Sequence, residues 1–321
     1  MLSAEVLSAA VLVALALDRW LGEPPARWHP VVWIGHFLGW AGRRVAPPAG
    51  AQAAALDGAS LLRGSLAWCA GAACVLALAA GLQLLLVQAP AWLAALVLGL
   101  LLKPLLAWRM LRGEVQAVEA ALALSLEAGR ERLSWLVSRD VTALSENAVR
   151  ESAIESLAEN LNDSVIAPLF WFAIAGLPGA ALYRFANTAD AMWGYRGERE
   201  GRVWEWAGKW AARADDALSW LPARLTALLL ALPAGGLSWR ALRREAARTP
   251  SPNSGWPMAA MALALGLRLA KPGVYVLNEA GRPPQGPDTA RACALAGHSL
   301  ALLVGLAALV LLVLAAGGAH G

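Results

Sequence analysis

The chain is poor in charge and in cysteine, and both shortages narrow the classes of protein it can belong to. Charged residues make up 16% of the 321 positions, against roughly 25% in average soluble domains. The cysteines, Cys69, Cys74 and Cys293, show no spacing that suits zinc or a disulfide framework. We interpret them as buried small hydrophobic residues. The net charge of +4 is modest and forms no basic patch, so we expect no nucleic-acid partner.

The common signatures of nucleotide and hydrolase sites are also missing. The sequence has no G-x-x-x-x-G-K-[ST], no G-x-G-x-x-G after a strand, no G-x-S-x-G and no H-E-x-x-H. It has no internal repeat either. If the protein uses a nucleotide, it must bind it in an unconventional way.

Long apolar runs indicate a membrane protein, since 58% of residues are hydrophobic and the mean hydropathy is +0.51. We predict an all-α polytopic membrane bundle forming one domain over 1–321, with a polar catalytic region at 109–219. A short membrane helix is expected at 6–17. Full spans are expected near 64–87, 91–108, 221–237 and 296–316. Many of the 16 tryptophans flank these runs, where headgroups would lie.

A row of acids interrupts this apolar chain in "SENAVRESAIESLAENLNDSVIAP", 145–168. Asn147, Glu151, Glu155, Glu159 and Asp163 recur every fourth residue, so they share one face of a helix. Like charges at this spacing repel each other and weaken the helix. Carboxylate and amide oxygens suit Mg²⁺ bound together with a substrate phosphate. We therefore predict a metal–phosphate site, with a solvated helix face as the alternative.

The limits of this helix follow from its flanks. Asp140 or Thr142 can cap its start, it should run to about Leu161, and Pro168 marks its latest end. Arg150 is the only basic residue available in the stretch to neutralise the acids. The following apolar segment, 165–182, contains two prolines, and we expect it to turn back or lie buried rather than cross the membrane.

Three other polar stretches contribute candidates. In "YRFANTADAMWGYRGER", Asn187 and Asp190 could add oxygen ligands and Arg196 could bind phosphate, although interfacial arginines are the alternative. In "LDRWLGEPPARWHPVVWIGH", His29 is more simply a structural histidine than a ligand. In "RTPSPNSGWPMAAMA", Asn253 and Ser254 precede an apolar helix whose free N–H groups could bind an anion, or merely cap it.

Five stretches, in order along nearly the whole chain, together resemble one family. They are "DRWLGEPPARWHPVVWIG", "SRDVTALSENAVRESAIESLAENLNDSVIAPLF", "RFANTADAMWGYR", "SPNSGWPMAAMA" and "YVLNEAG". The family is that of the adenosylcobinamide-phosphate synthases of cobalamin biosynthesis, called CbiB or CobD. The resemblance implies an integral-membrane ligase that joins (R)-1-amino-2-propanol, or its O-phosphate, to the free propionate of adenosylcobyric acid, with ATP as co-substrate and Mg²⁺ as cofactor.

The resemblance also guides the expected roles. Glu151, Glu155, Glu159 and Asp163 would hold the metal, and the catalytic set would be Glu151, Glu155, Asp190 and His29. Substrate or nucleotide would be bound by Asp18, Glu23, Asn147, Asn160, Asn187, Arg196, Asn253 and Ser254. The corrinoid, with its cobalt, would be a substrate and not a protein-ligated cofactor.

The resemblance further implies a multi-pass protein of the bacterial inner membrane, with its active site facing the cytoplasm. The lipid bilayer is one expected partner, and the membrane-bound cobalamin-phosphate synthase of the same pathway is a candidate for another. The basic stretch 239–248 fits a cytoplasmic flank. Two alternatives remain open. One is a Mg²⁺-dependent membrane prenyl or phospho-alcohol transferase, and the other is a transporter whose intramembrane acids relay ions.

Overall fold

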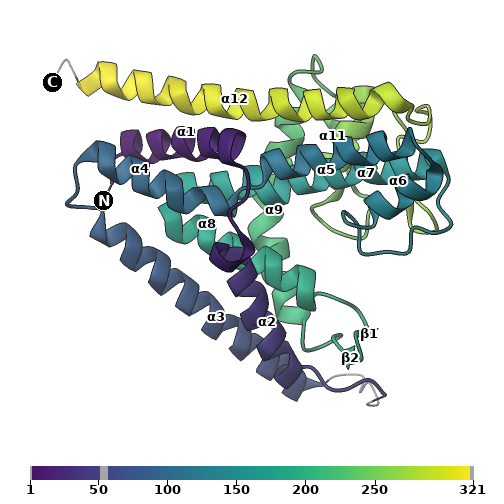
Figure 1. Ribbon diagram of the computed structural model, residues 1–321, viewed down its shortest axis with the longest axis horizontal. Helices are drawn as coiled ribbons and strands as arrows, with labels where there is room; N and C mark the ends of the chain where they lie inside the picture. Colours follow the sequence, from purple (N-terminus) through teal and green to yellow (C-terminus); the bar gives the residue numbers. More distant parts are fainter. Residues whose placement is uncertain (1, 51–56, 319–321) are drawn as a thin grey trace. The chain divides into compact units, whose positions relative to one another are not determined.

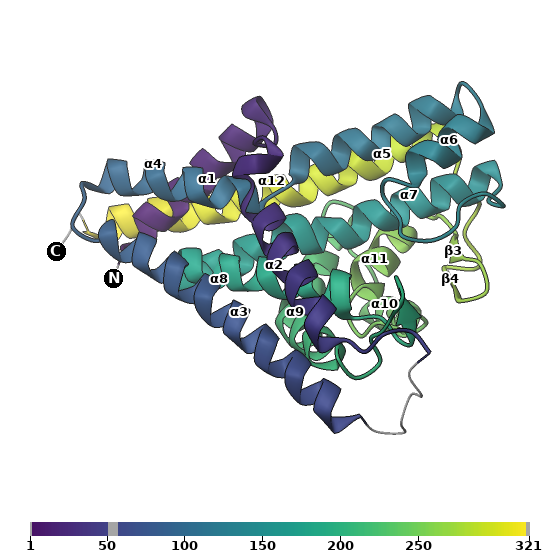
Figure 2. The same cartoon turned by 60° about the horizontal axis from the view of Figure 1, so that its bottom comes forward.

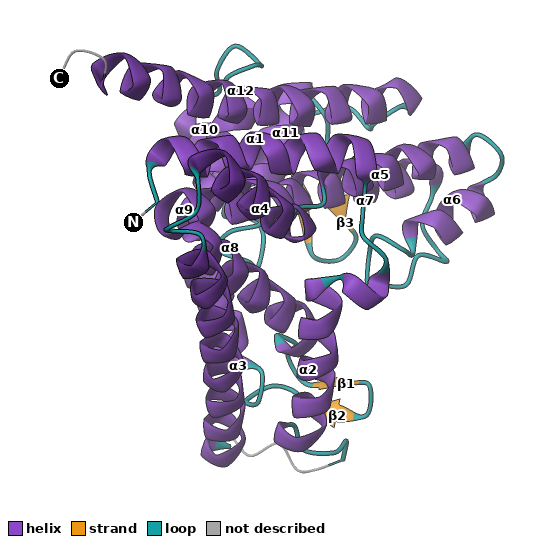
Figure 3. Cartoon of the chain, turned by 60° about the vertical axis from the view of Figure 1, so that its left-hand side comes forward, coloured by secondary structure: helices purple, strands orange, loops and turns teal. Residues whose placement is uncertain are grey.

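The computed structural model describes residues 2–50 and 57–318, and it confirms the all-α prediction (Figures 1 and 3). The helices are α1 (Ala4–Leu21), α2 (Pro30–Val45), α3 (Gly58–Leu85), α4 (Ala91–Leu102), α5 (Trp108–Leu122), α6 (Leu126–Leu133), α7 (Glu146–Leu161), α8 (Ala167–Trp193), α9 (Lys209–Ala231), α10 (Trp239–Ala246), α11 (Gly255–Leu265) and α12 (Gly286–Gly318). Two small antiparallel hairpins pair β1 (Glu198–Arg199) with β2 (Arg202–Val203), and β3 (Leu269–Lys271) with β4 (Tyr275–Leu277).

Four helical stretches in the described residues are long and apolar enough to cross a membrane. They are Gly58–Leu85, Ala91–Leu122, Glu146–Trp193 and Gly286–Leu309. The predicted runs near 64–87, 91–108 and 296–316 all fall on these stretches. The predicted short helix at 6–17 lies within α1, which is not one of the four.

The span predicted at 221–237 is wrong. Helix α9 begins twelve residues earlier, at Lys209, and ends at Ala231. Gly235 and Gly236 follow it with φ angles of 83° and 94°, a left-handed conformation that breaks a helix. Helix α9 is not one of the four stretches.

The chain forms two compact units, each made of two separate stretches. Unit 1 comprises Met1–Leu106 and Ala167–Ser219, and unit 2 comprises Ala107–Ile166 and Trp220–Gly321. The polar region predicted at 109–219 is thus shared between them: the whole row of acids belongs to unit 2, and the segment from Asn187 to Arg196 belongs to unit 1. The single membrane domain, and a single site made from both segments, stay predictions.

Unit 1 is held together by helix pairs that approach closely. Helix α1 packs along α4, and both α2 and α3 pack on α8 (Figure 3). A Cβ atom at Gly99 of α4 would lie only 2.9 Å from the backbone oxygen of Ala10 and 2.5 Å from Val13 Cγ1. Such small residues let membrane helices pack backbone to backbone. The buried aromatic core of the unit includes Trp68 and Phe185.

The segment 165–182 turns back at Gly176, as expected. At this kink φ is 65° and ψ is −152°, and two helical stretches meet. A Cβ atom at Gly179 would lie only 2.3 Å from the backbone oxygen of Trp171, eight residues earlier. The amide freed by this kink, that of Leu177, donates to Gln83 Oε1 on α3 at 2.8 Å. Buried backbone groups in an apolar setting need such partners. The prediction that this segment does not cross the bilayer is untested.

Helix α7 is the centre of unit 2. Helices α5, α6, α11 and α12 and strand β3 all pack against it (Figure 2), and every residue from 151 to 158 is buried. The predicted alternative of a solvated helix face is therefore wrong. The cap is also corrected: Ser145 accepts from the amide of Ala148, while Asp140 accepts from the amide of Thr142.

The proline expected to end this helix does not do so. A π-helical turn over Asn162–Ile166, η3, connects α7 directly to α8, which contains Pro168. Such π-turns insert one residue into a helix and are frequent at functional sites. Helix α7 itself ends at Leu161, as predicted, but helical structure continues past Pro168.

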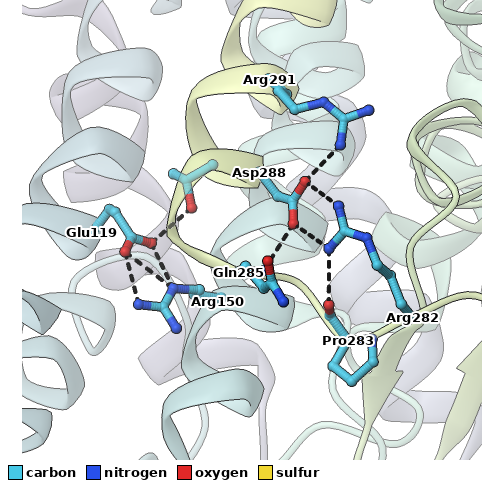
Figure 4. A network of polar contacts seen from close by, with 8 residues as sticks. Glu119, Arg150, Arg282, Pro283, Gln285, Asp288 and Arg291 are labelled. Carbon is cyan, nitrogen blue, oxygen red and sulfur yellow. Dashed lines mark hydrogen bonds and ion pairs between the residues drawn. The ribbon is translucent and has the colours of Figure 1, made fainter.

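Polar pairs fix the start of α12 to α5 and α7 within unit 2 (Figure 4). Arg150 of α7 donates to both oxygens of Glu119 of α5 at 2.9–3.0 Å, and Thr289 of α12 donates to the same carboxylate at 2.9 Å. Beside them, Asp288 accepts from Arg282 and Arg291. Arg150 thus forms ion pairs with Glu119 and Glu146, and these two acids are not members of the predicted row.

Candidate active site

Two of the predicted acids, Glu151 and Glu155, lie on successive turns of α7 and are only 2% and 4% exposed. Arg268 lies 3.4 Å from Glu151, and Arg139 lies 3.7 Å from Glu155. Charge-assisted hydrogen bonds are normally about 2.7–2.9 Å long, so both ion pairs are loose. Among the described residues, Oε1 of Glu155 has no hydrogen-bond partner. A buried carboxylate left in this state is costly, which suggests a function for it.

The β3–β4 hairpin brings two further polar residues to Glu155. Lys271 and Tyr275 both interact electrostatically with this carboxylate. Burial raises the pKa of the Tyr275 phenol, and the charges of Glu155 and Glu159 raise it further. Tyr275 is therefore protonated at neutral pH and can donate a hydrogen bond. Glu155 is surrounded by Arg139, Lys271 and this phenol, whereas Glu151 has Arg268.

The donor set fits a magnesium ion that is shared with phosphate, but not a cage of four acids. Mg²⁺ is usually held by one or two carboxylates, water and substrate phosphates. Glu151 and Glu155 could supply two oxygens of that kind. Within the described ranges, no group of three or more His, Cys, Asp or Glu side chains could hold a metal ion. Glu159 and Asp163 are partly exposed, and Asp163 accepts from Asn162 at 2.7 Å.

The other residues predicted from unit 2 have separate contacts. Asn147 is exposed, and Asn160 donates to the backbone oxygen of Ser156 at 2.9 Å. Asn253 accepts from Arg224 at 2.7 Å. Ser254 stands at the start of α11 but makes no side-chain cap hydrogen bond. Their predicted role in binding substrate or nucleotide is untested.

Unit 1 brings together the three residues predicted at its amino-terminal end. Asp18, Glu23 and His29 gather around Lys103, whose Nζ lies 2.9 Å from Glu23 Oε2 and 3.5 Å from Asp18 Oδ1. His29 Nε2 lies 3.2 Å from the same Glu23 oxygen. Since Nδ1 of His29 accepts from the amide of Val31, the ring proton belongs on Nε2, facing Glu23.

The charge balance of this cluster favours an ionised Glu23. Burial acts to raise the pKa of Glu23, but the hydrogen bond with His29 and the ion pair with Lys103 outweigh it and lower the pKa below its usual value. The sequence argument missed Lys103 because it lies in an apolar run, "LLLKPLL". A single lysine inside such a run was the available signal, since intramembrane charges are rare without a role.

The predicted residues of α8 lie beside α9 in unit 1. Asn187 accepts from Arg184 and donates to Asp215, at 3.4 and 3.5 Å. Burial raises the pKa of the neighbouring Asp216, and the charges of Arg213 and Arg196 oppose this rise. Arg196 therefore lies near Asp216. Whether Asp190 and Asn187 bind a metal ion or amine is untested.

Comparisons with known proteins agree on one family. The family model described as "CobD/Cbib protein" matches residues 11–314. A probable cobalamin biosynthesis protein CobD of Methanothermobacter thermautotrophicus is 41% identical over 319 residues, covering 95% of this chain and 98% of the relative. The cobalamin biosynthesis protein CobD of Chromobacterium violaceum is 44% identical over 280 residues, covering 85% of each. No solved structure matches the chain significantly.

Proposed function

Because the chain belongs to the CobD/CbiB family of cobalamin biosynthesis proteins, we propose that it is an ATP-dependent amide ligase of the membrane. Its substrates would be adenosylcobyric acid and (R)-1-amino-2-propanol or its O-phosphate, and its product adenosylcobinamide or its phosphate. We further propose that it lies in the cytoplasmic membrane with its active site facing the cytoplasm. The arginine-rich helix α10 supports this orientation.

The single observation that best supports this chemistry is the state of Glu155. It is buried, has one oxygen without a hydrogen-bond partner in the described part of the chain, and lies among the cations Arg139 and Lys271. Forming an amide from a free carboxylate first requires activation. In the proposed reaction a propionate oxygen attacks the γ-phosphorus of ATP, giving an acyl phosphate and ADP. The amine nitrogen then attacks the carbonyl carbon, inorganic phosphate leaves, and the nitrogen loses its extra proton.

The residues around α7 suit the first step. Arg139, Arg268 and Lys271 can offset the negative charge of a transferring phosphoryl group, which is the main task of phosphoryl-transfer sites. Tyr275 can donate a hydrogen bond to a phosphate oxygen. Glu151 and Glu155 would hold a magnesium ion, which would supply positive charge to offset that of the phosphates.

The predicted catalytic role of His29 and the predicted binding roles of Asp18 and Glu23, all in unit 1, are untested.

The test uses purified protein in detergent with ATP, Mg²⁺, adenosylcobyric acid and aminopropanol phosphate. We expect ADP release that requires both organic substrates, with one amide product formed per ADP. Glu155→Gln should lower the rate at least about a hundredfold, as for loss of an electrostatic group in an active site. Glu127→Gln, on the exposed face of α6, is the matched control and should keep the activity.

Two results would contradict the proposal. Consumption of a prenyl diphosphate in place of the corrinoid would favour the transferase alternative. ADP release that does not depend on the corrinoid and the amine would exclude an amide ligase.

A further inference from the structure

Unit 1 contains a cavity of about 860 Å³, which is within the size range of ligand-binding pockets. Residues of α1, α2, α3 and α8 line it, together with the loop after α1 and the end of α4. Nearly all of these residues are apolar. Among the described lining residues, the only charged side chains are Glu23 and Lys103. The cavity therefore has one charged end and an otherwise apolar wall.

The charged end has capacity for a cationic hydrogen-bond donor. Oε2 of Glu23 contacts His29 and Lys103, but among the described residues its buried Oε1 has no hydrogen-bond partner. A ligand that brings an ammonium group to Glu23 would donate a hydrogen bond to this oxygen. A phosphate a few bonds away would then lie near Lys103.

The apolar wall has the features of a surface that faces lipid. Trp28 and Trp33 line the cavity and are 63% and 50% exposed. Exposed tryptophans favour the headgroup layer of a bilayer. Leu78 and Cys74 line it from α3, one of the helices long and apolar enough to cross a membrane. One part of the cavity wall is thus formed by tryptophans typical of the headgroup layer. Another part is formed by α3, which is long and apolar enough for the hydrocarbon core.

We propose that this cavity binds a bilayer phospholipid with a primary-amine headgroup, such as phosphatidylethanolamine. The ammonium donates to Glu23, the phosphate lies beside Lys103, and an acyl chain lies along α3. A corrinoid fits less well, because its many amide groups would need hydrogen-bond partners that an apolar wall does not supply. A soluble amino-alcohol phosphate would leave the apolar part of the cavity unfilled. This lipid site does not depend on the proposed ligase reaction.

The binding test counts phospholipids retained by the full-length protein in detergent, by native mass spectrometry. The protein is mixed with phosphatidylethanolamine, phosphatidylcholine or phosphatidylglycerol of identical acyl chains. Phosphatidylcholine has no N–H group, so it cannot donate to Glu23. We expect phosphatidylethanolamine to bind about tenfold more tightly than either other lipid, the ratio for one hydrogen bond to a charged group.

Two pairs of matched variants locate the site. Cys69 and Cys74 are both exposed on α3, so the prediction that they are buried is wrong. Cys74→Phe places a ring in the cavity, whereas Cys69→Phe makes the same change on the same helix at a position that does not line it. Glu23→Gln removes the charge at the polar end, whereas Glu5→Gln removes an exposed charge from α1. We expect the first member of each pair to lose the preference for phosphatidylethanolamine and the second to keep it. Circular dichroism and gel filtration confirm that each variant is folded.

Three outcomes would overturn the proposal. Equal retention of the three lipids would show that no amine is recognised. An unchanged preference in folded Cys74→Phe would place the lipid elsewhere. Displacement of the lipid by adenosylcobyric acid, or by phosphoethanolamine without acyl chains, would assign the cavity to a soluble ligand.

Discussion

Replacing Lys103 by methionine should destabilise unit 1 strongly. The side chains of Lys103 and Asp18 are 7% and 1% exposed, and that of Glu23 is 19% exposed. Methionine keeps the length of the side chain but leaves two carboxylates without their cation. Breaking a buried ion pair by removing one partner costs about 3–5 kcal/mol in free energy of unfolding. For a unit of this size, that corresponds to a fall in Tm of about 6–20 °C.

The matched control is Lys209→Met. Lys209 pairs with Glu205 at 3.7 Å, but its side chain is 38% exposed, and exposed ion pairs contribute about 0–1 kcal/mol. Thermal unfolding of both variants in the same detergent, followed by circular dichroism, measures the difference. In addition, the triple variant Lys103→Met, Asp18→Asn, Glu23→Gln should recover most of the stability, because it leaves no buried charge unpaired.

The reasoning would be refuted if Lys103→Met melted within 2 °C of Lys209→Met. It would also be refuted if the triple variant melted lower than Lys103→Met alone. Either result would mean that Asp18 and Glu23 do not depend on Lys103 for their charge.

Three further predictions concern unit 1. Gly99→Ala should lower the free energy of unfolding by about 1–3 kcal/mol, because its Cβ would collide with the backbone of α1. Gly81→Ala, whose Cβ meets nothing within 4 Å, should be neutral or stabilising. Melting curves of the two variants measure the difference. Gln83→Leu should cost about 1–3 kcal/mol, because the amide freed at the kink loses its acceptor, and hydrogen exchange of that amide should accelerate. Because the pKa of Glu23 is lowered in the folded state, the stability that Glu23 contributes is complete above pH 4.5, its ordinary pKa, and is lost as the pH falls through the folded-state pKa. The free energy of unfolding should therefore fall more steeply with decreasing pH in the native protein than in Glu23→Gln. Equal slopes would contradict this.

The sequence predicted the elements that depend on local pattern. Short-range spacing alone indicated the row of acids on one helix and three of the apolar runs. It also drew attention to the stretch that contains Asp18, Glu23 and His29. The helix containing Glu155 was recognisable because its acids recur every fourth residue. The preference of an apolar run for helix is likewise local.

The sequence did not predict features that depend on distant partners. The partner of Glu151 is Arg268, 117 residues away, so a reading of the acidic stretch alone found no cation for it. Pro168 appeared to end the helix because a π-turn before it has no simple sequence signature. Lys103 was hidden in a run that reads as a span. In each case the deciding contact lies outside the local window.

The anchoring of α12 has a consequence for the order in which the protein can mature during synthesis. Thr289 donates to Glu119, a residue 170 positions earlier, and the β3–β4 hairpin that supplies Lys271 and Tyr275 also belongs to the last part of the chain. Proteins are made from the amino terminus, at about 5–20 residues per second. Glu151 and Glu155 therefore leave the ribosome several seconds before Arg268, Lys271 and Tyr275. A chain truncated before residue 268 lacks these three partners of the two acids.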